Sequence, residues 1–260
     1  MSNRYSHVDR EGHVTVVTLN RPENLNALHA DANLELAGIF DEFEADPEQW
    51  VAIVTGNGRA FCAGNDLKVT AESGLKRDDR LKSGFAGLTS RLKMNKPTIA
   101  AVNGVAMGGG FELALACDLI IAAEDAIFAL PEPRFGLVAL GGGVVRLPQQ
   151  IGVKRAMSII LTGRRVSAAE GKELGFVNDI APQGQALEVA KRWAAQITEL
   201  SPMSIRASKE AVRLSSEMAT EQALDAQFDF PAMRAMFESD DYREGPRAFV
   251  EKRPANWKGA

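Results

Sequence analysis

Short apolar runs rich in β-branched residues punctuate the first half of the chain, and each is followed by a glycine, a proline or polar residues. Such runs predict buried β-strands. They cover residues 14–19, 51–55, 98–102 and 118–123, with a shorter run at 126–129. Between the first two runs, apolar side chains recur at helical spacing until Asp46 and Pro47. A strand, a helix and a second buried strand predict a right-handed crossover between parallel strands of one sheet.

The order of strand, turn, strand and helix recurs with an offset of roughly 45 residues, which predicts strands stacked turn upon turn rather than laid out in one flat sheet. A helical stretch is expected up to Lys96, before the break at Pro97. Residues 70–80 are charged, contain glycine and lack an apolar period. They predict a loop or lid, or a plain solvated connection.

From Ser167 onward the pattern predicts helices alone. Ser167 to Glu170 has the sequence of a capping box, and Gly175 is expected to end that helix. Further helical stretches are expected at 187–197, from Pro202 after an N-cap at Ser201, at 220–238 with a break at Pro231, and at 241–252. We therefore expect a core at residues 1–200 and a C-terminal helical region at 201–260 that packs against other subunits.

Composition narrows the class of protein. The 260 residues are 45% hydrophobic and 25% charged, as in ordinary globular proteins. A net charge of −4 offers no basic surface for nucleic acid. Cys62 and Cys117 lack the spacing of a metal site or a disulfide framework, which favours a reducing cytoplasm. Neither a secretory signal nor a membrane span is expected, because the first residues are polar and no apolar run approaches ~20 residues.

The first candidate site is a glycine loop that leads into a helix. Gly108, Gly109 and Gly110 follow a strand-like run, and Glu112 is the one charge in the first turn of the apolar helix. Glycines let a backbone approach a ligand, and the first amides of a helix attract negative charge. An amide aimed at a thioester oxygen beside a proton-moving carboxylate can support enolate chemistry. The alternative is a tight turn followed by a solvated acid.

Two further stretches have comparable features. Pro131 and Pro133 flank Glu132, and the second proline is expected to hold this carboxylate in extended geometry. Residues 60–68 are rich in small side chains, so their backbone can also approach a ligand. Each of the two, taken alone, could equally be a surface turn.

Together these stretches resemble the crotonase superfamily, and enoyl-CoA hydratases in particular, over nearly the whole chain. The similar motifs lie at residues 24–28, 60–68, 108–114, 117–118, 131–132 and 248–253. The resemblance implies an α/β fold, a crotonase-type spiral of ββα units with a C-terminal helical trimerisation region. It also implies a homotrimer or a dimer of trimers, and coenzyme A as part of the substrate with no metal or other cofactor.

The same resemblance assigns roles to individual residues. Glu112 and Glu132 are the expected catalytic pair around a water molecule, and the backbone amides of Asn65 and Gly109 are the expected oxyanion hole. The remaining positions are expected to contact CoA or substrate, the last two from a neighbouring subunit: Ala27, Ala63, Asp66, Leu67, Lys68, Phe249 and Lys252.

The expected reaction is the reversible addition of water across the 2,3 double bond of an enoyl-CoA thioester. Two close carboxylates push their pKa values apart, so Glu132 is expected to protonate C2 while Glu112 orients the water. Isomerases of this superfamily commonly lack the counterpart of Glu112, which favours a hydratase over an isomerase or another enolate-forming lyase. A non-catalytic RNA-binding homologue is the alternative from a different class, and the acidic balance speaks against it.

Two features leave the acyl group open. Asn65 stands where many hydratases have alanine, and its side chain is expected to narrow or polarise the acyl entrance. Residues 136–143 lack the proline common in fatty-acid hydratases, and residues 144–148 and 254–259 resemble crotonobetainyl-CoA hydratases about as well. A straight-chain, an aromatic and a zwitterionic acyl group are all compatible with the sequence.

Overall fold

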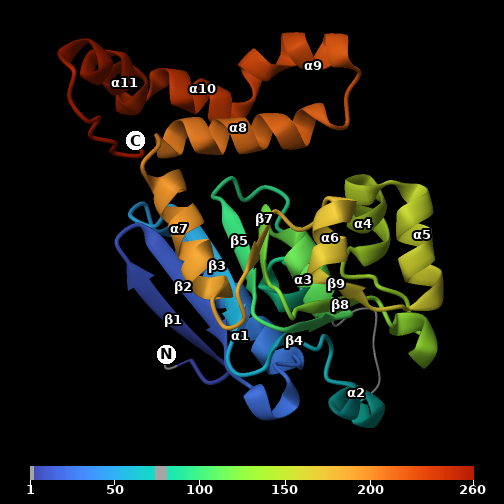
Figure 1. Cartoon of the computed structure of the whole chain (residues 1–260). Helices are drawn as coiled ribbons and strands as arrows, with labels where there is room; N and C mark the ends of the chain where they lie inside the picture. Colours follow the sequence, from blue (N-terminus) through green and yellow to red (C-terminus); the bar gives the residue numbers. More distant parts are fainter. Residues whose placement is uncertain (1–2, 74–80) are drawn as a thin grey trace.

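In the computed structural model, which describes residues 3–73 and 81–260, the strands form two sheets (Figure 1). The larger sheet has the order β1-β2-β3-β5-β7-β10, and the smaller has the order β4-β6-β8-β9. The strands are β1 (Ser6–Glu11), β2 (Val14–Leu19), β3 (Val51–Gly56), β4 (Ala60–Cys62), β5 (Thr98–Val102), β6 (Val105–Met107), β7 (Leu119–Ala123), β8 (Ile127–Ala129), β9 (Val166–Ser167) and β10 (Asp179–Ala181).

Consecutive strands are divided between the two sheets. In each of the pairs β3–β4, β5–β6 and β7–β8, the first strand joins the larger sheet and the second joins the smaller. Neighbours from successive pairs run parallel, with Ile53 opposite Ile99 and Ile99 opposite Leu119. Each pair is therefore one turn of the chain stacked on the turn before it, which confirms the predicted stacking. The α/β class is confirmed as well.

Helices cover the sheets and extend beyond them. They are α1 (Ala30–Ala45), α2 (Leu67–Ser73), α3 (Gly109–Ala116), α4 (Gly143–Ile151), α5 (Val153–Thr162), α6 (Ala168–Leu174), α7 (Ala186–Thr198), α8 (Pro202–Ser215), α9 (Thr220–Ala226), α10 (Pro231–Glu238) and α11 (Asp240–Glu251). The helix expected before Asp46 is confirmed as α1, with the predicted apolar positions buried. The Ser167 cap, the Gly175 terminus, the Ser201 cap and the break at Pro231 are also confirmed.

The central strands β3 and β5 of the larger sheet are apolar on both faces because both faces are covered, whereas the edge strand β1 is polar and mostly exposed. Every residue of β3 and β5 is buried, and α7 packs against both strands. The last four helices form a layer above this core, joined to it through α7 (Figure 1). Lys209 of α8 pairs with Asp118 at 2.7 Å, which ties the layer to the start of β7. The division of the chain near residue 200 stays a prediction.

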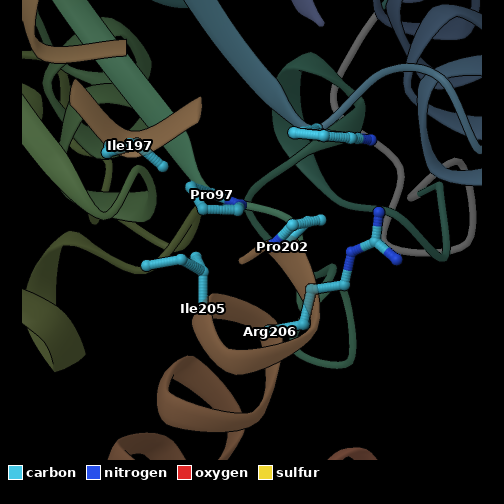
Figure 2. A pocket seen from close by; sticks show the side chains of 6 residues that line it. Pro97, Ile197, Pro202, Ile205 and Arg206 are labelled. Atoms are coloured by element: carbon cyan, nitrogen blue, oxygen red, sulfur yellow. The ribbon is translucent and has the colours of Figure 1, made fainter. Parts of the chain in front are cut away.

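A small cavity lies where α7 passes into α8 (Figure 2). Its lining consists of Trp50, Pro97, Ile197, Pro202, Ile205 and Arg206. These are residues of the junction between the core and the helical layer, and none of them belongs to the predicted site. Among the residues the structure describes, none of the helices combines the length and apolarity needed to cross a bilayer.

Several local predictions are wrong. The stretch before Lys96 is not helical: it contains turns and the short 3₁₀ helix Phe85–Gly87. Gly84, Ala86 and Gly87 all have positive φ, and a Cβ on Gly87 would lie 2.4 Å from the backbone nitrogen of Ala37 in α1. Close packing on α1 therefore overrides the local helical pattern.

Two further regions differ from the sequence prediction. They are residues 70–80, expected to be a loop or lid, and the chain from Ser167 onward, expected to be helical throughout. Residues 70–73 belong to α2, whereas residues 74–80 lie outside the described residues. The short strand β10 lies where helices alone were expected, and it pairs with β7 in parallel. Its three residues are too few to give an apolar period, so only the neighbouring strand defines it.

Candidate active site

Glu112 lies in the first turn of α3, where the strand pair β5–β6 delivers the chain into the helix. Gly108 precedes the helix with a φ of 54°, a conformation that suits glycine. The Glu112 side chain is buried, and the residue is only 4% exposed. The alternative of a solvated first-turn acid is therefore wrong.

Gly141, in the loop before α4, and Gly143, the first residue of α4, lie against the Glu112 carboxylate. The Gly143 N–H donates to Glu112 Oε1 at 2.8 Å. A Cβ on Gly141 would lie 2.7 Å from Glu112 Oε2, so a side chain at position 141 would collide with the carboxylate. Burial raises the pKa of Glu112 from 4.5 to about 7, and the charge of Glu132 adds to this rise. The amides of Gly143 and Gly141 and the Arg146 guanidinium oppose it.

Glu132 follows β8 and comes up against the loop that opens α3. The expected extended geometry is wrong, because Glu132 begins the 3₁₀ helix Glu132–Phe135. The Leu137 N–H donates to the Glu132 carbonyl at 3.0 Å, and this bond closes the turn despite Pro133. A Cβ on Gly108 would lie 3.0 Å from Glu132 Oε1, so Gly108 leaves room for the carboxylate.

The two carboxylates act on one another. Glu132 Oε2 is buried and makes no hydrogen bond to any described residue. Burial raises the pKa of Glu132 as well. Because its charge also raises the pKa of Glu112, the two groups cannot both ionise easily near neutral pH. The arrangement can hold one proton between two acids, beside an unpaired carboxylate oxygen.

The loop after β4 presents the Asn65 amide in a defined direction. The Leu28 N–H donates to the Gly64 carbonyl at 2.8 Å, and the Asp66 N–H donates to the Leu28 carbonyl at 2.9 Å. In extended backbone, successive amides point to opposite sides. The Asn65 N–H therefore points away from Leu28, and it donates to no described residue.

The Gly109 amide lies beside this loop. It is the first residue of α3, so its N–H has no intrahelical acceptor. A Cβ on Gly64 would lie 2.9 Å from Gly109 N, which places the Gly64–Asn65 backbone directly against the start of α3. The structure thus brings the two predicted oxyanion amides together with the two carboxylates. Such unpaired amides can hold a developing negative charge on a thioester oxygen.

The Asn65 side chain lies against α2, and its expected effect on the acyl entrance stays a prediction. Its Nδ2 donates to Thr70 Oγ1 at 2.6 Å, and that hydroxyl donates to the Asp66 carbonyl at 3.0 Å. The amide group is therefore bound to the first turns of α2. It ties α2 to the loop at residues 63–66, which we call the oxyanion loop. The presence of asparagine instead of alanine at position 65 did not predict this contact.

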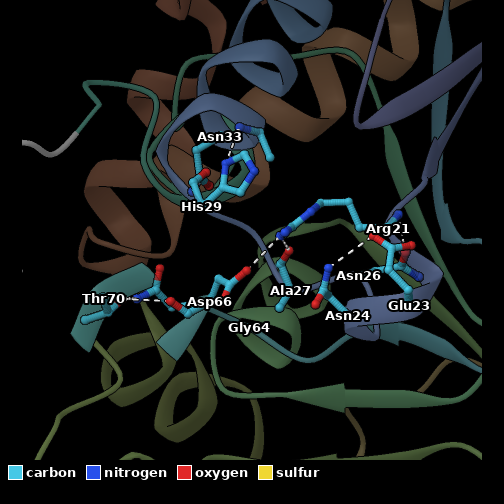
Figure 3. Close-up of polar contacts among 12 residues, drawn as sticks. Arg21, Glu23, Asn24, Asn26, Ala27, His29, Asn33, Gly64, Asp66 and Thr70 are labelled. Carbon is cyan, nitrogen blue, oxygen red and sulfur yellow. Dashed lines mark hydrogen bonds and ion pairs between the residues drawn. The ribbon is translucent and has the colours of Figure 1, made fainter. Parts of the chain in front are cut away.

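Arg21 is a residue that the sequence analysis missed. Its guanidinium pairs with Asp66 at 3.1 Å and donates to the Ala27 carbonyl (Figure 3). Both charged side chains are largely buried. Burial would raise the pKa of Asp66, but the bond and charge of Arg21, together with the backbone amides of Val69 and Lys68, lower it overall. Arg21 therefore joins two of the predicted substrate-binding positions, although its sequence position between a strand and Pro22 gave no sign of this partner.

The other predicted binding residues divide into two groups. Ala63 is half-buried in the oxyanion loop, and Leu67 and Lys68 are exposed on α2. Phe249 is 86% exposed at the end of α11, and Lys252 follows it. In Figure 1, α11 and α2 lie at opposite ends of the molecule, so a single chain does not bring these two groups together. Within residues 3–73 and 81–260, no cluster of three or more His, Cys, Asp or Glu side chains could hold a metal ion.

The raised pKa of Glu112 has a consequence for stability. A carboxyl whose pKa is higher in the folded state stabilises the fold below pH 4.5 and loses that contribution as the pH rises through about 7. Glu112→Gln removes this loss. We compare the free energy of unfolding of the variant with that of wild type at each pH. We expect the difference, variant minus wild type, to be about 2–3 kcal/mol larger at pH 8 than at pH 4.

Denaturant unfolding at the two pH values measures this gain. The matched control is Glu173→Gln in α6, an exposed carboxylate for which no such gain is expected. If the free-energy difference between Glu112→Gln and wild type were the same at pH 4 and pH 8, burial would not raise the pKa of Glu112.

Comparison with known proteins identifies the family. Residues 9–260 match the family model described as enoyl-CoA hydratase/isomerase. A carnitinyl-CoA dehydratase of Salmonella typhi is 43% identical over 259 residues, covering 97% of this chain and 98% of the relative. The crystal structure of an enoyl-CoA hydratase from Mycobacterium tuberculosis H37Rv superposes with a TM-score of 0.91 at 39% identity, covering 98% of this chain and 99% of that one.

A second solved structure agrees. An enoyl-CoA hydratase from Bacillus anthracis has a TM-score of 0.88 at 36% identity, covering 99% of this chain and 100% of that one. The crotonase-type fold implied by the sequence resemblance is thereby confirmed. The family match runs over nearly the whole chain and covers the positions of Glu112, Glu132, Asn65 and Gly109. The chain belongs to the enoyl-CoA hydratase/isomerase family, within the crotonase superfamily.

Proposed function

We propose that the protein is a hydro-lyase that adds water reversibly across the 2,3 double bond of an enoyl-CoA thioester to give a 3-hydroxyacyl-CoA. One observation carries this proposal: the buried carboxylate of Glu112 and the half-buried carboxylate of Glu132, whose Oε2 is buried and unpaired, lie beside two unpaired amides, those of Asn65 and Gly109. Hydration requires this combination, because an isomerase moves one proton with one base whereas water addition needs a proton removed and a proton delivered.

The proposed chemistry balances within the site. The Asn65 and Gly109 amides donate to the thioester oxygen, and each is worth roughly 3–4 kcal/mol as negative charge develops there. One carboxylate takes a proton from water as the new C3–O bond forms. The other carboxylic acid delivers its proton to C2 as the enolate collapses. A proton passed between the two neighbouring acids restores the starting state.

Burial raises the pKa of both carboxyls, and the charge of Glu132 raises that of Glu112 further, to about 7. We propose that the pair shares one proton near neutral pH. The expected division of roles, in which Glu132 protonates C2 and Glu112 orients the water, stays part of this proposal.

The acyl group is proposed from the relatives. Those solved at 36–39% identity are enoyl-CoA hydratases, and those at 42–43% identity are carnitinyl-CoA dehydratases. We propose a short 2-enoyl-CoA as substrate, with crotonobetainyl-CoA as the second candidate. Crotonobetainyl-CoA is kept as a candidate because the carnitinyl-CoA dehydratases have slightly higher sequence identity, over 97% of the chain.

A substrate panel tests the proposal. Crotonyl-CoA, longer 2-enoyl-CoA esters and crotonobetainyl-CoA are each mixed with the protein, and the conjugated ultraviolet absorbance of the enoyl thioester is followed. We expect absorbance to fall for at least one ester, with a product whose mass has increased by one water. Unchanged absorbance with every ester, or a shifted double bond without a mass increase, would contradict the proposal. The relative kcat/KM values identify the preferred acyl group.

We also propose a homotrimer or a dimer of trimers built through residues 201–260. In that assembly Phe249 and Lys252 would reach the CoA of a neighbouring subunit, because α11, at whose end they lie, is far from α3, which carries Glu112, in Figure 1. The molar mass of the protein in solution distinguishes a monomer, a trimer and a hexamer. The cytoplasmic location and the absence of a nucleic-acid or membrane partner stay predictions.

A further inference from the structure

Arg146 connects two segments that approach the candidate site from different parts of the chain. It lies in α4, and its guanidinium reaches back over the start of its own helix. Arg146 Nη2 donates to the Thr89 carbonyl at 2.7 Å, and Nη1 lies 3.5 Å from the Gly141 carbonyl. The guanidinium therefore holds the segment around Thr89 to the loop that precedes α4.

Each of these segments touches a different part of the site. In the Thr89 segment, the Phe85 ring packs over the oxyanion residue: a Cβ on Gly109 would lie 2.7 Å from Phe85 Cζ. In the other segment, Gly143 donates to Glu112. Arg146 thus joins the segment whose Phe85 ring packs over Gly109 to the segment whose Gly143 amide binds the Glu112 carboxylate.

The glycine loop leaves space for this guanidinium. A Cβ on Gly142 would lie 2.0 Å from Arg146 Nη1, and Gly142 has a φ of 117° that disfavours a side chain in any case. The Arg146 guanidinium therefore fills the space that a side chain at position 142 would need. The glycines at 141 and 142 serve different side chains, since the first makes room for Glu112 and the second for Arg146.

Charge couples the arginine to the carboxylate. Burial lowers the pKa of Arg146, and the nearby Glu112 opposes that change. In return, the Arg146 charge lowers the pKa of Glu112. The charged groups that act on Glu112 among the described residues are Glu132, from the 3₁₀ helix after β8, and Arg146, from α4. The ring of Phe85 and the side chain of Thr89 carry no charge.

We propose that Arg146 is a positioning residue for the hydration reaction: its guanidinium clamps the Gly141–Gly143 loop to the Thr89 segment and holds the Glu112 carboxylate in its reactive place. This inference rests on the proposed function. It assigns no contact between Arg146 and the substrate, so its loss affects the chemical step more than CoA-ester binding.

The test compares Arg146→Met, Arg146→Lys and the matched control Arg155→Met, an exposed arginine of α5. We expect Arg146→Met to lower kcat by about 10-fold or more through misplacement of Glu112, with a much smaller change in KM. Arg146→Lys keeps the charge and should regain part of kcat. Arg155→Met should behave as wild type. Thermal unfolding of each variant confirms that it is folded.

A second readout does not depend on activity. The carboxyl ¹³C signal of Glu112, assigned by comparison with Glu112→Gln, is titrated in the ligand-free protein. Removal of the Arg146 charge should move its titration to higher pH, since a positive charge favours the ionised carboxylate. Arg146→Lys should move it less, and Arg155→Met should not move it.

The outcomes separate the two proposals. Wild-type kcat together with a wild-type Glu112 titration in folded Arg146→Met would overturn the role of Arg146. So would an Arg146→Lys variant that is folded yet no closer to wild type than Arg146→Met in either readout. If wild type hydrates none of the enoyl-CoA esters, the proposed function fails, whereas the Glu112 titration still decides whether Arg146 controls this carboxylate.

Discussion

Glu112→Gln and Glu132→Gln are each expected to lower kcat for enoyl-CoA hydration by about 10³-fold, within the range that general acid–base catalysis supplies. Glutamine has nearly the same shape as glutamate, and at position 112 its oxygen can still accept the bond from Gly143. It can neither take a proton from water nor release one to C2. The packing therefore survives while the proton transfer is lost.

Steady-state hydration of the preferred enoyl-CoA, followed by ultraviolet absorbance, measures the loss. Binding of the 3-hydroxyacyl-CoA product should change little, because the oxyanion amides of Asn65 and Gly109 are backbone groups. Glu173→Gln, on the exposed face of α6, is the control and should keep wild-type kcat. Glu112 and Glu132 act as one unit, so the double variant should be barely slower than either single one. Turnover that survives in both single variants would refute the catalytic pair.

Gly110→Ala is expected to lower the free energy of unfolding by about 4 kcal/mol or more. Single substitutions have effects this large only when they cause severe defects such as a collision with the backbone. A Cβ at this position would lie 1.9 Å from the Cys62 carbonyl oxygen and 2.9 Å from Cys62 Cβ. Cys62 ends β4, so its backbone cannot retreat without moving the strand that carries the oxyanion loop. The glycine is required because α3 crosses β4 at direct backbone contact.

The matched variant is Gly38→Ala, at an exposed position within α1. Apart from its chain neighbours and the backbone of its own helix, no heavy atom of the described residues lies within 4 Å of a Cβ placed on Gly38. Alanine is the better helix former, so this variant should gain about 0.5–1 kcal/mol. Denaturant unfolding of both variants measures the two free energies. A Gly110→Ala protein as stable as wild type would mean that α3 and β4 are not packed this closely in solution.

Elements with a strong local pattern were predicted well from the sequence. The strand at 51–56 is buried on both faces, so its β-branched residues form one continuous apolar run. The helix α6 begins directly after its N-cap Ser167, whose side chain accepts from the Glu170 N–H at 3.2 Å. In these cases the information lies within a few neighbouring residues, and no distant partner is needed to interpret it.

Elements defined by distant partners were not predicted. The segment before Lys96 has helical composition but is bent by its packing on α1. Glu132 was expected to be extended because a proline follows it, yet the hydrogen bond from Leu137 closes a 3₁₀ turn. The strand β10 exists only because β7 offers it a free edge. Local preferences of this size are smaller than the energy of one close tertiary contact.

The sequence by itself determined which chemical groups the protein has available: two carboxylates, two glycine-rich or small-residue loops, and an order of motifs shared with the crotonase superfamily. Only the tertiary structure decided that Glu112 is buried with a pKa near 7, that Arg21 pairs with Asp66, and that Arg146 lies beside the carboxylate. Gly143 binds Glu112 from 31 residues away, and Arg21 meets Asp66 across 45. Burial and charge coupling come into being when such segments meet, so no local pattern of residues can encode them.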